Sequence, residues 1–130
     1  MHGEIPAHKI FEDEQSFAFL DIHPLAEGHT MIIPKHHYEK LEDLPDLELT
    51  CLFETVQKIS RSARKALTAS ATTIGINNGR AAGQVVPHLH IHVIPRWDGD
   101  GGGSVHSIIK NPCKRNLEDV LKLLVAEAQK

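Results

Sequence analysis

Three histidines at alternate positions form the most reactive pattern in the sequence. They are His88, His90 and His92. In an extended strand successive side chains point to opposite faces, so this spacing puts the three imidazoles on one face and the intervening aliphatic residues on the other. Pro87 and Pro95 bracket the run, as suits a strand whose ends lack ladder partners. We therefore predict a strand with a buried aliphatic face and with imidazoles that line a surface or cleft.

Such a face supports two kinds of chemistry. Neighbouring imidazoles are about 6.6 Å apart at Cα, and the outer two about 13 Å, whereas a zinc–nitrogen bond measures about 2.0–2.1 Å. A His-x-His pair can chelate one ion, but all three histidines can do so only if the strand bends. Alternatively, one imidazole acts as a nucleophile or acid–base group while its neighbours donate hydrogen bonds to phosphate oxygens. The spacing alone does not separate these two chemistries.

A loop of small and turn-forming residues, from Asn77 to Gln84, leads directly into the histidine run. Small residues let backbone N–H groups approach a phosphate closely, and asparagine side chains can donate to its oxygens. The loop begins Asn77-Asn78-Gly79, which is ordinary turn chemistry, and by itself it favours a hairpin turn. Its position just before three aligned imidazoles favours phosphate binding instead.

The strands expected beside the histidine run are short segments rich in β-branched and aromatic residues. They span residues 9–12, 16–22, 29–34 and 72–76. The first is expected at a sheet edge, and the second and third as a hairpin-like pair. Asp21 stands near the end of the second, where its residue type alone favours a turn-initiating role. Residues 38–46 are expected to form a loop or a short helical turn, and residues 98–104 a flexible connector.

Two helices are predicted. From Leu47 to Leu67 apolar residues recur at helical spacing, with acids near the start and bases toward the end, which matches the helix macrodipole. We expect this amphipathic helix to cover one face of the sheet. Asn116 is expected to cap a final helix. Its apolar stripe comprises Leu117, Val120, Leu121, Leu124 and Val125. Core packing and a subunit contact are both open for that stripe.

The composition is that of a globular protein. The 130 residues suffice for one domain with a single core, and 41% are hydrophobic and 24% charged. A net charge of −3 argues against general nucleic-acid binding, which depends on a basic surface. Cys51 and Cys113 suit reduced thiols better than a disulfide framework. No signal peptide or membrane span is visible. We expect a cytoplasmic protein with neither nucleic-acid nor membrane partners.

The segment Gly83–Ile94 resembles the His-φ-His-φ-His-φ-φ signature of the histidine triad (HIT) superfamily of nucleotide hydrolases and transferases. Other blocks are similar to that family in order and spacing: Phe19–Pro24, Gly28–His29 with Met31–His37, and Ile76–Gly79. The resemblance covers roughly residues 3–97. The sequence pattern supports an α+β fold. The resemblance implies a HIT-like single domain over 1–130, with residues 98–130 as a C-terminal loop and helix. It also implies a five-stranded antiparallel sheet that continues across a homodimer.

The resemblance assigns the nucleophile to His90. In the family the middle histidine attacks the α-phosphorus of a nucleoside phosphate derivative and forms a covalent nucleotidyl-imidazole, from which water releases the nucleoside monophosphate. By analogy the backbone carbonyl of His88 accepts the other ring proton of His90. His92 and Gln84 are expected to contact phosphate or leaving-group oxygens. The implied substrates are adenosine-type phosphoramidates, adenylates or dinucleoside polyphosphates, and no metal or other cofactor is required.

The resemblance also implies a nucleotide-binding set, in which the acid bonds the ribose hydroxyls and the loop holds the phosphate. The set is Asp21, Ile22, Asn77, Gly83, Gln84, Val85, His90 and His92. Val85 stands where close relatives often carry Ser or Thr, which puts the leaving-group preference in doubt. Some relatives bind zinc through an N-terminal Cys-x-x-Cys pair that this sequence lacks. We therefore expect His36 and His37 to be surface residues and predict no structural zinc.

Two other functions stay open. One is metal-dependent hydrolysis through His88, His90 and His92, which loss of activity in a chelator would favour. The other is a nucleotide-binding regulatory module with little turnover, which nucleotide binding without catalysis would favour. The intact triad together with Gln84 argues against the regulatory module.

Overall fold

A computed structural model describes residues 8–130, so the first residues of the expected core, from residue 3, lie outside the described part. The chain divides into two compact units, one that ends at Asp100 and one from Gly101 to Lys130. The division falls inside the connector predicted over residues 98–104. Each unit is described by itself below.

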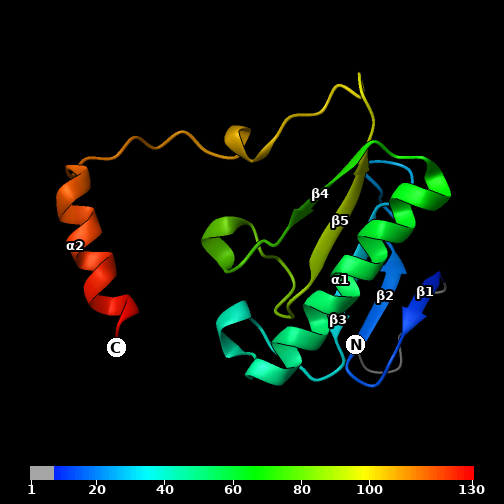
Figure 1. Cartoon of the computed structure of the whole chain (residues 1–130), viewed down its shortest axis with the longest axis horizontal. Helices are drawn as coiled ribbons and strands as arrows, with labels where there is room; N and C mark the ends of the chain where they lie inside the picture. Colours follow the sequence, from blue (N-terminus) through cyan, green and yellow to red (C-terminus); the bar gives the residue numbers. More distant parts are fainter. Residues whose placement is uncertain (1–7) are drawn as a thin grey trace. The chain divides into compact units, whose positions relative to one another are not determined.

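The described part of the first unit is built on a five-stranded antiparallel sheet (Figure 1). The strands are β1 (Lys9–Glu12), β2 (Ser16–Leu20), β3 (Thr30–Pro34), β4 (Ala71–Gly75) and β5 (Ile91–Arg96). Their order is β1-β2-β3-β5-β4, which puts β1 at one edge, as predicted, and β4 at the other. The register pairs Phe19 with Met31 in the β2–β3 hairpin and Met31 with His92 in the next ladder. The predicted α+β fold is confirmed.

Helix α1 (Asp46–Leu67) lies across one face of this sheet. Its buried side chains include Leu52, Val56 and Ile59, which join one apolar cluster with residues from the strands. Asp46 and Glu48 lie in its first turn, and Arg64 and Lys65 in its last, as the macrodipole favours. The strand and triad-segment residues of this cluster are Ala18, Ile32, Leu89, Ile91 and Val93. The predicted aliphatic face of the histidine run is therefore the face that α1 covers.

The opposite face of the sheet carries a second apolar cluster. It comprises Phe17, Phe19 and Ile33, with Met31 packed against it. The two phenylalanine rings meet edge to face, with centroids 5.8 Å apart. Because Met31 pairs with His92 in the sheet, His92 points to this face and away from α1.

The structure corrects the predicted histidine strand in two respects. Strand β5 begins only at Ile91, so His88 and His90 lie in the segment that precedes it. Pro95 does not end the strand but lies within it, paired with Thr72 of β4. Pairing of β5 with β3 extends only from Ile91 to Val93, so Pro95 has a strand neighbour on one side. A proline is tolerated there because no ladder donor is needed on the open side.

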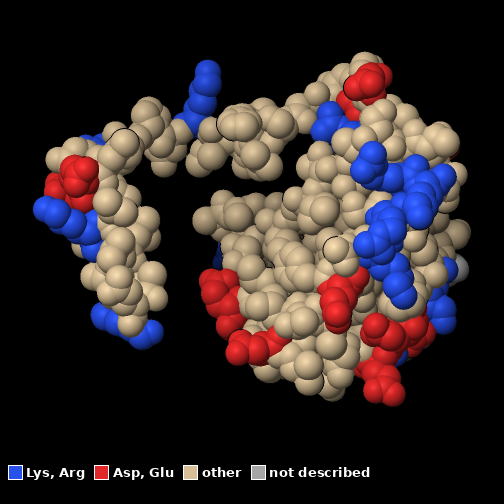
Figure 2. All heavy atoms as spheres, viewed as in Figure 1, with Lys and Arg blue, Asp and Glu red and all other residues tan. Residues whose placement is uncertain are grey.

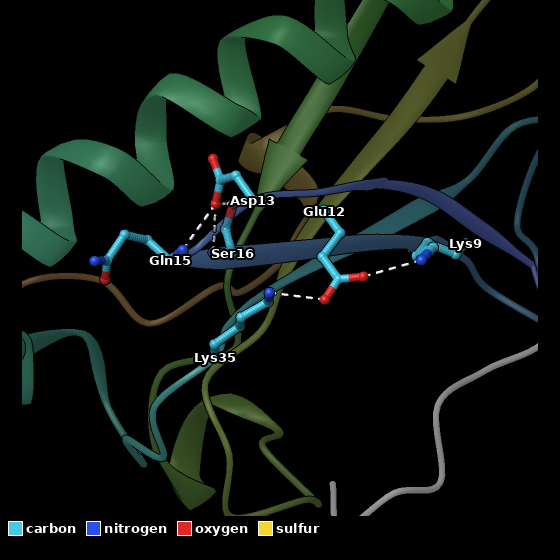
Figure 3. Close-up of polar contacts among 6 residues, drawn as sticks. All are labelled: Lys9, Glu12, Asp13, Gln15, Ser16 and Lys35. Carbon is cyan, nitrogen blue, oxygen red and sulfur yellow. Dashed lines mark hydrogen bonds and ion pairs between the residues drawn. The ribbon is translucent and has the colours of Figure 1, made fainter.

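A polar turn fixes the β1–β2 edge of the sheet (Figure 3). The Asp13 carboxylate accepts hydrogen bonds from the backbone N–H groups of Gln15 and Ser16, at 2.9 and 2.8 Å. Burial opposes ionisation of Asp13, but these two hydrogen bonds prevail and lower its pKa. The fully buried Ser16 hydroxyl also lies 2.7 Å from the hydroxyl of Thr55 on α1. The turn thereby ties β2 to the helix above it.

The second unit contains a short 3-10 turn (Val105–Ser107) and helix α2 (Leu117–Ala128). The side chain of Asn116 accepts a hydrogen bond from the N–H of Asp119 at 2.9 Å, so the predicted cap is confirmed. The apolar side chains of Leu117, Leu121 and Leu124 are exposed. Within residues 8–130 no helix has the length and apolar content needed to cross a membrane.

Candidate active site

The ring of His90 has one nitrogen engaged and one free for chemistry. Its Nδ1 lies 2.9 Å from the backbone carbonyl oxygen of His88. A carbonyl oxygen only accepts hydrogen bonds, so Nδ1 of His90 carries the hydrogen and Nε2 carries the lone pair in the neutral ring. The His90 ring is half-buried, and its centroid lies 5.0 Å from that of His92 at an interplanar angle of 75°. A nucleophilic nitrogen therefore lies beside a second imidazole.

A hydrogen-bond chain sets the tautomer of His92. The backbone N–H of Leu25 donates to Nδ1 of His29 at 3.1 Å, so the hydrogen of neutral His29 must be on Nε2. This Nε2 lies 2.9 Å from Nδ1 of His92 and donates to it. The remaining hydrogen of neutral His92 is then on its own Nε2. His92 is thereby a hydrogen-bond donor through Nε2.

Burial favours the neutral forms of His29 and His92. Desolvation lowers the pKa of His29, and the nearby Asp21 carboxylate opposes that effect. Desolvation likewise lowers the pKa of His92, and the neighbouring rings of His90 and His29 lower it further. The tautomer assignment above, which assumes neutral rings, is consistent with these directions.

His29 was not among the predicted site residues. It is 2% exposed and begins the turn into β3, from which its ring reaches His92 across 63 positions of sequence. The only sequence signal for it was its place in the Gly28–His29 block. Gly28 has φ of 84°, and a Cβ there would lie 2.4 Å from Cδ1 of Leu67. The end of the Leu67 side chain could shift, but the positive φ favours glycine at this turn, which leads into His29.

Asp21 lies at the edge of the same cluster. One carboxylate oxygen accepts the N–H of His23 at 2.8 Å, which is the turn role that its residue type suggested. The other lies 3.6 Å from Nε2 of His29. The next residue, Ile22, is 71% exposed beside it. The carboxylate of Asp21 and the exposed side chain of Ile22 thus lie next to each other and close to His92.

A metal fits this donor set poorly. In the described part of the chain, one trio of potential ligands has all its donor atoms within 4.8 Å, namely Asp21, His29 and His92. His29 Nδ1 already accepts a backbone hydrogen bond, so its Nε2 holds the hydrogen and has no lone pair for an ion. His88 and His90 do not belong to the trio. The geometry thus does not favour the metal-dependent alternative.

The loop before the triad has the open backbone that was expected of it. It contains a 3-10 turn, Arg80–Ala82, flanked by Gly79 and Gly83 with φ of 100° and 99°. Side-chain-bearing residues rarely adopt such angles. Asn77 and Gly83 are both exposed, and the Asn77 side chain lies beside the Gly83 backbone. Val85 is 91% exposed. The loop therefore presents backbone and an asparagine amide to solvent next to an uncovered valine.

Gln84 differs from the other loop residues because it is buried. Its side-chain oxygen accepts the N–H of Gly79 at 2.8 Å. Its Nε2 donates to the carbonyl oxygens of Glu39 at 2.7 Å and Val86 at 3.1 Å. The structure does not leave this amide open to a substrate, in contrast to the role expected from the resemblance.

The segment that follows β3 contacts the triad segment. We call residues 36–42 the bracing segment. His36 and His37 are exposed, as predicted, but Nδ1 of His37 also lies 2.8 Å from Nδ1 of His88, and the two rings stack at 4.9 Å. His88 itself is buried rather than open to a cleft. Burial and the adjacent His37 both lower the pKa of His88.

Comparison with known proteins identifies the family. Residues 2–99 match the family model described as the HIT domain. An uncharacterised HIT-like protein of Methanocaldococcus jannaschii is 44% identical over 122 residues, which cover 94% of this chain and 92% of that protein. The adenosine 5′-monophosphoramidase of Saccharomyces cerevisiae is 44% identical over 100 residues, or 77% of this chain and 61% of the enzyme. The adenylylsulfatase of Arabidopsis thaliana is 38% identical over 118 residues, which cover 91% of this chain and 60% of that enzyme.

Solved structures agree with these sequence matches. A HIT family protein from Bacillus subtilis superposes with a TM-score of 0.82 at 38% identity, over 98% of this chain and 90% of that chain. The family match and the shared fold together define the class of protein. The chain belongs to the HIT family.

Proposed function

We propose that this protein is a nucleotide hydrolase or transferase that cleaves the α-phosphate linkage of adenosine-type nucleotides through a covalent intermediate on His90. The observation that carries the proposal is the hydrogen bond from Nδ1 of His90 to the carbonyl oxygen of His88, which leaves Nε2 as a nucleophile. In the first step Nε2 bonds to the α-phosphorus, and the leaving group departs with its electron pair. In the second step water attacks the phosphorus, the P–N bond breaks, and a nucleoside monophosphate is released.

The surrounding residues support this chemistry in distinct ways. His92, with its hydrogen on Nε2, donates to a phosphate or leaving-group oxygen and stabilises the charge that develops there. The loop from Asn77 to Gly83 holds the phosphate through its exposed backbone and the asparagine amide. Asp21 binds the ribose hydroxyls, with Ile22 beside it against the nucleoside.

The substrate class rests on relatives. One enzyme similar to this chain is named an adenosine 5′-monophosphoramidase and another an adenylylsulfatase. Both names describe cleavage next to an adenosine 5′-phosphate. Adenosine phosphoramidates and adenylates are therefore the first substrates to test, and dinucleoside polyphosphates the next.

We also propose that the sheet continues across a homodimer at β4. Among the described strands β4 has a neighbour on one side only. A groove of about 710 Å³ runs between β4 and α1, and Phe53 and Ile74 are partly exposed along it. Figure 2 shows basic side chains gathered over the C-terminal part of α1 and acidic ones toward its N-terminal part. An antiparallel pair of α1 helices brings these opposite charges together.

The test is AMP release from an adenosine phosphoramidate by the wild type and by His90→Asn, both in excess EDTA. Asparagine keeps polarity and approximate size but removes the nucleophilic nitrogen. We expect the wild type to turn over in EDTA and the variant to lose activity by at least a thousandfold, since the covalent route is removed. Loss of wild-type activity in EDTA would contradict the proposal and favour metal-dependent hydrolysis. AMP binding without turnover under any condition would favour a regulatory module.

A further inference from the structure

Gln84 lies where three segments of the chain meet. Its side chain is 8% exposed and contacts Gly79, Glu39 and Val86 at 2.7–3.1 Å. The orientation of the amide is fixed, because an N–H group faces its oxygen and two carbonyl oxygens face its nitrogen. A primary amide has two hydrogens, and here each has an acceptor within the protein. Neither is left over for a phosphate.

The three segments that Gln84 joins have different parts in the site. Gly79 belongs to the loop that holds the phosphate in the proposed function. Val86 begins the segment that carries His88 and His90. Glu39 belongs to the bracing segment, which is distant from both in sequence. We call residues 77–83 the phosphate loop and residues 86–90 the nucleophile segment. The buried side chain of Gln84 thus connects the phosphate loop, the nucleophile segment and the bracing segment.

Further hydrogen bonds, which do not involve Gln84, join the bracing segment to the loop before the triad and to the segment that carries His88 and His90. The N–H of Leu89 donates to the carbonyl oxygen of Tyr38 at 2.7 Å. The side chain of Asn78 accepts the N–H of Leu41 at 2.9 Å and donates to Glu42 at 2.6 Å. These bonds join the same three segments around Gln84. The distance between the phosphate loop and His90 is therefore set through the bracing segment.

The bracing segment is in turn anchored to the core helix. The hydroxyl of Tyr38 donates to the carboxylate of Glu48, in the first turn of α1. Nδ1 of His36 lies 2.6 Å from the other carboxylate oxygen. The hydrogen bond from Tyr38, and then that from His36, lower the pKa of Glu48, so its charge is kept in this contact. The bracing segment is thus hydrogen-bonded to the first turn of α1, the helix that packs on the sheet.

We propose that Gln84 is a positioning residue that fixes the phosphate loop relative to His90, and that it does not contact the substrate. The inference rests on the proposed function, because it concerns the distance between the nucleophile and the phosphate. A misplacement of about 1 Å between reacting groups can reduce a rate by about 100-fold. A buried amide with three hydrogen bonds is well suited to prevent it, because each group left unpaired by a shift is penalised.

The first test is Gln84→Met, which keeps the length of the side chain and removes all three hydrogen bonds. Its kcat is measured on an adenosine phosphoramidate, whose leaving amine has no oxygen, and on a dinucleoside polyphosphate, whose leaving group is a phosphate. We expect kcat to fall by about 10- to 100-fold on both substrates, with the two losses equal within threefold. Unchanged activity, or losses that differ by more than threefold, would overturn the proposal. Gln129→Met, at the exposed end of α2, is the matched control.

The second test needs no turnover. Amide hydrogen exchange is measured by NMR for Leu41 and Leu89, whose hydrogen-bond acceptors belong to Asn78 and Tyr38 and not to Gln84. In Gln84→Met we expect both amides to exchange about tenfold faster or more, because the remaining hydrogen bonds between the three segments open more often once those of Gln84 are lost. Faster exchange confined to Gly79 would show a local contact and overturn the proposal. If the wild type cleaves neither substrate, the proposed function fails, and this exchange result still decides the role of Gln84.

Gln84→Glu covers the case in which the methionine variant does not fold. It keeps an acceptor for the Gly79 amide but turns a carboxylate oxygen toward the carbonyl oxygens of Glu39 and Val86. The same comparison of two substrates applies, with equal losses expected. Unequal losses would again overturn the proposal.

Discussion

At the scale of single residues, the site depends on which nitrogen of each histidine carries hydrogen. The His88 carbonyl fixes that choice for His90, and the Leu25 amide fixes it for His92 through His29. These are contacts with backbone groups, which do not titrate. The tautomers on which the proposed roles of nucleophile and donor depend therefore follow from backbone contacts, and they hold as long as the rings stay neutral.

The prediction at this scale concerns His29. In His29→Phe the ring shape is kept but both hydrogen bonds are lost, so His92 is no longer held as an Nε2–H donor. We expect kcat to fall by about 10- to 100-fold, less than the roughly 10²- to 10⁴-fold contribution of a positioned proton donor because His92 itself remains, and KM to change little. Long-range ¹H–¹⁵N spectra of the free protein should show His92 with hydrogen on Nε2 in the wild type and as a tautomer mixture in the variant. A wild-type spectrum with hydrogen on Nδ1 of His92 would refute the assignment.

At the scale of elements, the two faces of the sheet have different tasks. One face packs aliphatic residues of β3 and β5 under α1, and the other carries His92, which pairs with Met31 beside the smaller apolar cluster. His29 and His88 are buried and His92 is half-buried, and burial is the largest cause of the lowered pKa of each. Stability therefore depends on pH through these three rings.

The sign of that dependence follows from linkage. In the unfolded chain these histidines titrate near 6.5, and in the folded protein their pKa is lower. Below pH 6.5 the unfolded state binds more protons, so stability is fully present above 6.5 and is lost as the pH falls below it. The slope is at most about 1.4 kcal/mol per pH unit for each histidine. Urea unfolding at pH 7.5, 6.5 and 5.5 measures it.

The variants for this measurement are His88→Asn and the matched control His106→Asn, at an exposed position of the second unit. We expect a smaller slope of the unfolding free energy below pH 6.5 in His88→Asn and the wild-type slope in His106→Asn. Equal slopes in all three proteins near pH 6 would contradict the histidine account.

Carboxylates affect the pH dependence of stability at lower pH. Glu12 lies between Lys35 and Lys9 (Figure 3), and its hydrogen bonds to them lower its pKa to about 2. Its contribution is present above its unfolded pKa of 4.5 and lost as the pH falls toward 2.

At the scale of the whole molecule, the two edges of the sheet differ. The groove on α1 lies beside β4, and Ile74 on that strand is 43% exposed. Ile10 on β1, at the opposite edge, is 45% exposed. The two isoleucines are thus matched in residue type and exposure, but only one lies on the edge proposed to pair.

The prediction for the dimer uses this match. In Ile74→Lys a charge is placed in the proposed subunit contact, so we expect the protein to sediment as a monomer at micromolar concentration. Ile10→Lys should remain a dimer. A monomeric wild type, or dissociation in Ile10→Lys with none in Ile74→Lys, would contradict the proposed interface. Sedimentation velocity separates these outcomes without an activity assay.

The sequence by itself determined the local patterns, because these depend on the period of the side chains along one element. Alternation from Leu89 to Val93 was enough to predict a buried aliphatic face, and helical spacing predicted α1 from Leu47, one residue after its observed start. The cap at Asn116 and the edge position of β1 were also readable. The resemblance at the triad block was specific enough to predict the family.

Only the tertiary structure decided how the patterned residues are used. It placed the start of β5 after His90, because the preceding segment is held by the bracing segment instead of a strand ladder. It brought His29 to His92 and turned the Gln84 amide inward, through contacts between residues 63 and 45 positions apart. Hydrogen-bond partners at such separations are fixed by packing and not by local spacing. The resemblance was therefore enough to predict the contact between His90 and the His88 carbonyl, but the tautomer of His92 and the positions of His29 and the Gln84 amide were not predictable from the sequence.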